Sequence, residues 1–142
     1  IGGNFGRRGT ISVGIILLAA AIFGISLTPV ATLTNVLTKL PVLGEILGIS
    51  IFLMVAGIAW SLININSLPM IVDLTSAARI GTYTGLYYLF STFSAIVGPN
   101  VNGWAIQLTN NNYNIIMALA PVFFFIALIM MVGVKRGEAV PL

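Results

Sequence analysis

The sequence contains no cysteine and no histidine, and it has few charged residues of either sign. Without cysteine the chain forms no disulfide and carries no thiolate. Without histidine it lacks the commonest general base and metal ligand, so we expect no metal site and no cofactor. Three residues are acidic and six are basic. The basic residues are scattered and form no patch of the kind that nucleic acid requires, so we expect no nucleic-acid partner.

Charged residues make up only 6% of the chain, whereas hydrophobic residues make up 58%. A soluble domain has about 25% charged residues. With so few charges the chain cannot present a wettable surface, and the lipid bilayer is its expected solvent. The first residue is Ile1 rather than methionine, and no signal peptide precedes the first apolar run. We therefore expect an internal or C-terminal piece of a longer protein.

Four stretches are long and apolar enough to cross a bilayer, which takes about 20 residues. The first two cover residues 11–31 and 46–72. No charge interrupts the chain from Ile80 to Val134, so this run must fold back, and the polar stretch 107–114 predicts the turn. The last two spans are thus expected at 80–106 and 115–134. Backbone groups in hydrocarbon need internal hydrogen bonds, so the sequence predicts an all-α membrane protein with one partial transmembrane domain over residues 1–142.

The loop charges predict how the chain is oriented. Five basic residues lie on one side of the predicted membrane: Arg7, Arg8, Arg79, Lys135 and Arg136. Lys39 is the one basic residue on the opposite side. This positive-inside bias places both termini in the cytoplasm and predicts a multi-pass protein of the plasma or inner membrane.

The second predicted span carries polar residues at membrane depth. Trp60 and Asn64 are four residues apart and share a helix face, and Ser67 follows three residues later. An amide in hydrocarbon usually faces the bundle interior or a water-filled cavity. An aromatic ring beside an amide suits a sugar, because the ring stacks on C–H groups while the amide binds hydroxyls. The alternatives are that Asn64 links helices and that Trp60 faces lipid or core.

Tyr87 is a fourth candidate for solute contact. It belongs to an aromatic cluster at the inner end of the third predicted span. A belt at the membrane interface explains most such aromatics. Tyr87 and Ser91 also suit the mouth of a cavity, and both readings stay open from sequence alone.

Two prolines are candidate pivots. Pro69 removes a backbone donor near the cytoplasmic end of the second span, where it predicts a gating bend or a simple irregularity at the helix end. Gly98 and Pro99 soften the outer half of the third span. The functional reading is a hinge for an inside-out motion, and the alternative is a static kink.

The inner loop between the second and third spans carries the charges Asp73 and Arg79. With Arg7 and Arg8 they are expected to form a cytoplasmic ion-pair cluster that holds one transporter state closed. The alternative is a solvated loop with negligible pair energy. No span contains a buried acid, so the residues do not show how a coupling ion would be handled.

Gly6, Arg7 and Arg8 ahead of a helix resemble the cytoplasmic signature loop of the major facilitator superfamily, although Gly3 stands about where that loop normally carries an acid. Asp73 lies where the family often places an acid that pairs with this loop. Ala95, Gly98, Pro99 and Gly103 look like its antiporter-type Gly-Pro signature. The order of spans is similar to the last four of twelve helices, which make up part of a C-terminal six-helix bundle.

Residues 57–69 look like the tenth helix of the sucrose and glycoside symporters of that superfamily, and residues 81–85 look like the start of the eleventh. This resemblance implies a sugar solute, a coupling proton or cation, and transport by alternating access. It also implies that the missing N-terminal half of the transporter supplies much of the site.

Two other functions compete with that of a transporter fragment. A self-contained four-helix membrane protein acting by oligomeric assembly, as a small exporter or structural subunit, is the alternative, but such exporters usually need an acid inside a span. A membrane enzyme would need nucleophilic, acid–base or metal groups at membrane depth. The spans offer none, so we expect no enzyme.

Overall fold

The computed structural model describes residues 2–41 and 44–134, and four long helices account for most of them. The helices are α1 (Gly2–Leu27), α3 (Ile49–Asp73), α4 (Ile80–Leu108) and α5 (Ile115–Gly133). Their bounds agree with the predicted spans to within a few residues, except that α1 starts earlier. Gly6 breaks its first turns with φ 68° and ψ 157°, so the regular part of α1 follows this residue.

Three of these helices are long and apolar enough to cross a bilayer: the Gly6–Leu27 part of α1, α3 and α5. The chain is therefore a multi-pass membrane protein by length and composition of its helices. α4 is the longest of the described helices, with 29 residues, but it carries polar residues such as Asn100, Asn102 and Gln107 along its C-terminal half. Its apolar character is correspondingly weaker, and it is not among the three.

The connection between α1 and α3 departs from the all-α prediction. It contains the short helix α2 (Val30–Leu33) and an antiparallel hairpin of β1 (Val36–Leu40) and β2 (Gly44–Leu47). The second span was expected to begin at residue 46, which lies in β2 instead. Gly44 has φ 75°, a left-handed backbone that suits glycine at the start of the returning strand.

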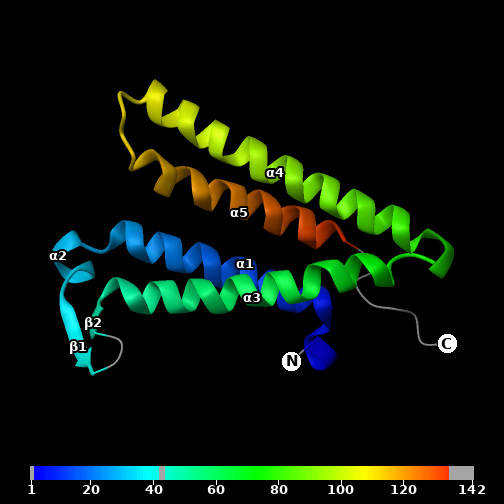
Figure 1. The fold of residues 1–142 in the computed structure, drawn as a ribbon, viewed down its shortest axis with the longest axis horizontal. Coiled ribbons are helices and arrows are strands. Elements are labelled where there is room, and N and C mark those ends of the chain that lie inside the picture. Colours follow the sequence, from blue (N-terminus) through cyan, green and yellow to red (C-terminus); the bar gives the residue numbers. More distant parts are fainter. Residues whose placement is uncertain (1, 42–43, 135–142) are drawn as a thin grey trace.

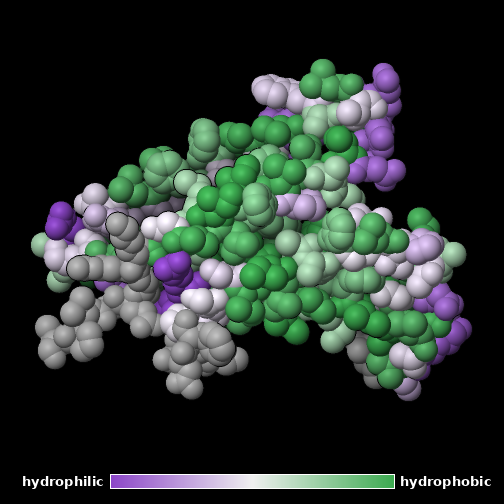
Figure 2. Space-filling view, turned by 180° about the vertical axis from the view of Figure 1, so that it is seen from behind, coloured by the Kyte–Doolittle hydropathy of each residue, from purple (hydrophilic) through white to green (hydrophobic). Residues whose placement is uncertain are grey.

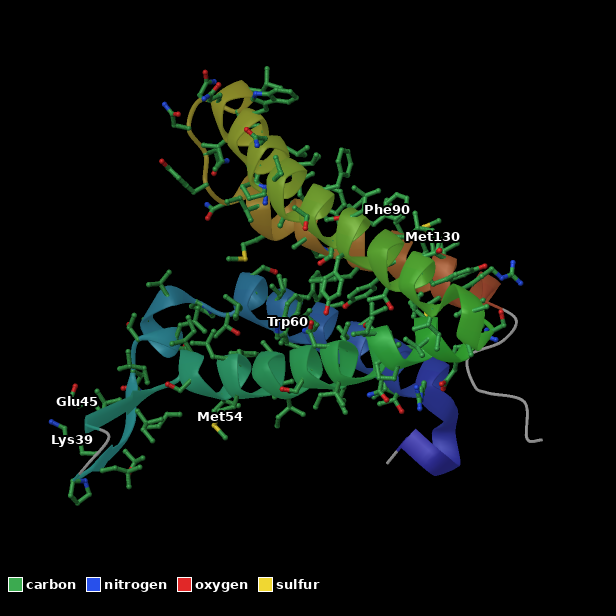
Figure 3. All side chains as sticks on the ribbon, turned by 45° about the vertical axis from the view of Figure 1, so that its right-hand side comes forward. Lys39, Glu45, Met54, Trp60, Phe90 and Met130 are labelled. Atoms are coloured by element: carbon green, nitrogen blue, oxygen red, sulfur yellow. The ribbon has the colours of Figure 1, made fainter. Side chains whose placement is uncertain are left out.

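The four helices form two antiparallel pairs (Figure 1). α1 packs most extensively on α3, while α4 lies beside α5. The second pair diverges from the first toward the α2 end, as Figures 1 and 3 both show. The buried residues Ile11 and Ile15 of α1 meet Met70 of α3 and Met131 of α5 near the other end. This cluster is where three helices converge.

The outer surface carries the hydropathy pattern of a membrane protein. Figure 2 shows hydrophobic side chains over the middle of the visible face, with hydrophilic ones gathered toward the ends. The exposed apolar side chains include Phe125 of α5 and Ile65 of α3, which are 64% and 71% exposed. In water such exposure would be costly, whereas lipid tails solvate these groups.

Candidate functional site

Arg7 and Asp73 form an ion pair that joins the start of α1 to the end of α3. Arg7 Nη1 lies 2.7 Å from Asp73 Oδ2, and the two side chains are 32% and 22% exposed. Among the described residues, no hydrogen bond from Nη1 accompanies this contact, so it is an ion pair rather than a well-formed hydrogen bond. The sequence predicted that these two residues would meet. Whether the pair opens and closes as a gate stays a prediction.

Arg8, the next residue, is attached to a different helix. Its Nη2 donates a hydrogen bond of 2.9 Å to the carbonyl oxygen of Val132, in the last turn of α5. A cation at the C-terminal end of a helix also interacts favourably with the helix dipole. Two consecutive arginines therefore connect α1 to α3 and to α5. The start of α1 and the end of α5 consequently lie on the same side of the molecule.

Arg79 does not join this cluster. It ends the short 3-10 helix Ala77–Arg79 and is exposed next to the start of α4. Within residues 2–41 and 44–134, no acid lies within ion-pair distance of its guanidinium group. Of the four residues predicted to form the gate, Arg7 and Asp73 contact each other, and Arg8 contacts a backbone carbonyl instead.

The polar side chains of α3 use their hydrogen-bonding groups on their own helix. Asn64 Nδ2 donates to Trp60 O at 3.0 Å, and Ser67 Oγ donates to Ile63 O at 2.6 Å. Trp60 is 60% exposed. Such back-bonding satisfies a polar group in hydrocarbon without a second helix or a solute. Asn64 is exposed and keeps its amide oxygen as an acceptor, while Ser67 is half-buried.

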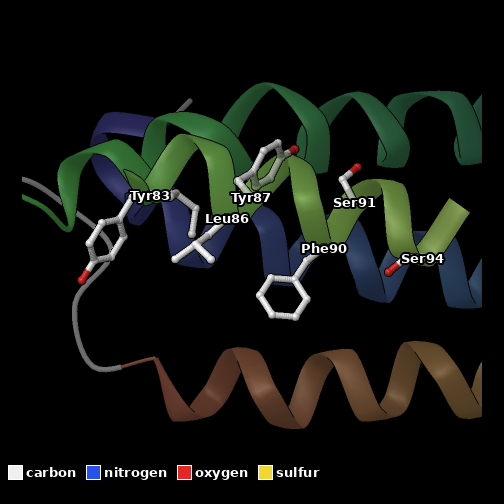
Figure 4. A pocket seen from close by; sticks show the side chains of 7 residues that line it. Tyr83, Leu86, Tyr87, Phe90, Ser91 and Ser94 are labelled. Atoms are coloured by element: carbon white, nitrogen blue, oxygen red, sulfur yellow. The ribbon is translucent and has the colours of Figure 1, made fainter. Parts of the chain in front are cut away.

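A hollow of about 500 Å³ lies along α4 (Figure 4), and Ile71 of α3 is one of its lining residues. Its other lining residues are Tyr83, Leu86, Tyr87, Phe90, Ser91 and Ser94. Tyr87 and Ser91, four residues apart, point to the same side of α4 in Figure 4. Among the described residues, the hydroxyls of Tyr87, Ser91 and Ser94 donate to no protein acceptor. This surface offers aromatic rings beside hydroxyl groups available to a ligand.

Ser94 was not singled out from the sequence as a site residue. The signal that finds it is its spacing, because Tyr87, Ser91 and Ser94 follow each other at four and three residues. Of the sequence-predicted solute residues, Tyr87 lines this hollow. Trp60, Asn64 and Ser67 are not among its lining residues.

A second hollow, of about 680 Å³, lies where the helix pairs diverge. Phe23 and Ser26 of α1 line one side, and Met117 of α5 with the preceding Asn114 lines the other. Ser26 Oγ donates a hydrogen bond of 2.7 Å to Phe23 O. α1 and α5 are therefore joined by Arg8 at one end and separated by open space at the other.

The candidate pivots lie inside unbroken helices. α3 continues through Pro69 and α4 continues through Pro99. A proline has no backbone N–H, so each site lacks one helical hydrogen bond and bends at lower cost than its neighbours. Gly98 has no heavy atom near the place where a side chain would start. α5 has a similar site at Pro121.

Comparisons with known proteins give no relative: no family model, no curated protein and no solved structure matches this chain. The geometry of these residues is therefore the basis for the functional argument.

Proposed function

We propose that the chain is the last four helices of a secondary transporter of the major facilitator type, with α4 as the fourth span. In this proposal it moves a small solute, most simply a sugar together with a proton or another cation, by alternating access. The side of the protein that carries Arg7, Arg8 and Arg79 faces the cytoplasm, and the protein lies in the plasma or inner membrane. The missing N-terminal half of the transporter supplies the facing side of the solute path.

The observation that carries the proposal is that α1 contacts α3 and α5 through charged side chains at only one of its two ends. Arg7 and Arg8 tie it to the ends of α3 and α5, while a hollow of about 680 Å³ separates α1 from α5 at the other end. Helices held at one end and apart at the other can rock about the attached end. A pair of partly exposed ions contributes only about 0–1 kcal/mol, so it is weak enough to break during such a motion.

The hollow along α4 supports a solute with hydroxyl groups. Tyr87, Ser91 and Ser94 provide hydroxyls that both donate and accept, and Phe90 provides a ring. Among the residues that the structure describes, no charged side chain lines this hollow. A neutral polyhydroxylated solute fits this chemistry better than an ion or an acid. We therefore place the main solute contact on α4, with Trp60 and Asn64 as secondary candidates.

The test is uptake of radiolabelled sugars by proteoliposomes that contain the full-length protein. Saturable uptake driven by an inward proton gradient, and abolished by a protonophore, supports the proposal. Ser91→Ala and Tyr87→Phe are expected to raise KM. Ser61→Ala is the matched control, since this exposed hydroxyl already donates to Gly57 O at 2.9 Å on its own helix.

Assembly with other helices is the second candidate function, and α4 provides the observation in its favour. Gly81, Gly85 and Gly103, like Gly98, have no heavy atom within 4 Å of the place where a side chain would start. Small residues on one helix let another helix approach closely. The partner is the rest of the transporter in the main proposal and another copy in the alternative. The mass of the purified protein in detergent separates the two.

A further inference from the structure

The hairpin of β1 and β2 has apolar side chains that the other described elements leave exposed. Leu37 is 51% exposed, Leu40 is 40% exposed and Val36 is 37% exposed. The hairpin has only two strands, of five and four residues. An isolated two-stranded hairpin is marginally stable in water. Its apolar side chains therefore need another apolar environment if the hairpin is to persist.

The position of the hairpin indicates what that environment is. In Figures 1 and 3 it projects from the α2 end of the α1–α3 pair and extends past α3 on the side away from α1. In Figure 1 it runs crosswise to the two helices. If α1 and α3 span a bilayer, a crosswise segment at their end runs along the membrane surface. In that arrangement the hairpin lies over the lipid that surrounds α3.

The two charged residues of the hairpin also suit a position at the membrane surface. Lys39 and Glu45 face each other across the strands in an ion pair of 2.6 Å, with side chains 73% and 51% exposed. Both point away from α3 in Figure 3. The pair leaves the hairpin with no net charge, so its binding does not require anionic lipid. Such a segment has an apolar body and a polar edge, as interfacial membrane segments do.

We propose that this hairpin is a lipid-contacting element that lies in the interfacial region of the bilayer. Leu37 and Leu40 enter the acyl boundary, and the Lys39–Glu45 pair stays at the level of the headgroups. The occupant of the apolar surface is neutral phospholipid, because exposed apolar side chains also cover the neighbouring ends of α1 and α3, where Leu27 is 68% and Met54 is 67% exposed. The proposal does not depend on what the protein transports.

The absence of cysteine makes the test direct, since a single introduced cysteine takes a spin label at one position. Leu37→Cys, Leu40→Cys and Asn112→Cys are made in the full chain and reconstituted in phosphatidylcholine vesicles. Asn112 is the matched control, because it is exposed in the α4–α5 loop on the same side of the molecule. Collisions of each label with oxygen, which prefers lipid, and with a water-soluble nickel chelate are then compared.

The expected result is an oxygen-to-nickel collision ratio several-fold higher at residues 37 and 40 than at residue 112. Equal ratios at all three sites would place the hairpin in water and overturn the proposal. Exclusion of both reagents, with spin–spin broadening that disappears when unlabelled protein is added, would show that a second copy covers the hairpin. That outcome also overturns lipid contact.

Discussion

Gly14 of α1 lies directly against the backbone of Ala59 of α3. A Cβ placed on Gly14 would come within 2.9 Å of Ala59 O and 2.8 Å of Ile63 Cγ1, and Ala59 is fully buried. Gly14 is thus a point of close backbone approach between α1 and α3, the two described helices with the most extensive contact. It is the kind of contact that holds membrane helices together when no hydrophobic effect acts between them.

Gly14→Leu should force α1 away from α3 and destabilise the pair by about 1–3 kcal/mol, the usual cost of overpacking. Gly57→Leu is the control, because the same side chain there enters open space. Thermal unfolding in detergent is the measurement. A melting temperature lowered equally by both substitutions would show that the close approach at Gly14 does not hold the helix pair together.

The Arg7–Asp73 ion pair should have a small but measurable coupling energy. A double-mutant cycle with Arg7→Gln and Asp73→Asn is expected to give up to about 1 kcal/mol, decreasing at high salt, because both side chains are partly exposed. The Lys39–Glu45 pair, which is more exposed, serves as the comparison and should couple less. A larger coupling for the hairpin pair would argue against a special role for Arg7 and Asp73.

Loss of Arg8 should loosen the end of α5. Arg8→Ala removes the donor to Val132 O, so backbone amides in the last turn of α5 should exchange with deuterium faster. Arg8→Lys should restore part of the protection, since a cation remains near the helix end. Arg79→Ala is the control on the same side of the molecule. Unchanged exchange in Arg8→Ala would mean that packing alone holds this turn.

The four long helices could be predicted from the sequence because uncharged runs of bilayer length end at charged or polar loops. The turn after α4 was also predicted, and Asn110 and Asn111 there have positive φ values of 55° and 60°. The hairpin was missed because its strands are short and continue the apolar character of the neighbouring helices, with Pro41 directly after β1. Periodicity does not separate such short apolar runs from helix.

Contacts of the candidate site could be predicted from the sequence where both partners are side chains. Arg7 and Asp73 have opposite charges on the same predicted side of the membrane, so their pairing followed from topology. The acceptor of Arg8 is a backbone carbonyl, which leaves no pattern in the sequence. Gly14 had a signal that was not used: Thr10, Gly14, Ala21 and Gly24 recur along one face of α1, as in close helix packing.

The two candidate solute surfaces are separable by kinetics. If α4 contacts the solute, Tyr87→Phe and Ser91→Ala should raise KM several-fold, because hydrogen bonds to the solute are lost. Trp60→Ala and Asn64→Ala should then change KM less, since Asn64 already donates to its own helix. Larger effects at Trp60 and Asn64 would move the site to α3. Unchanged uptake and affinity in both would remove these two residues from it.

The most direct test of the account is solute uptake by the full-length protein in sealed proteoliposomes. The account predicts saturable sugar uptake driven by an inward proton gradient, abolished by a protonophore and slowed in Asp73→Asn. Folded protein that takes up no sugar with or without the gradient would contradict it.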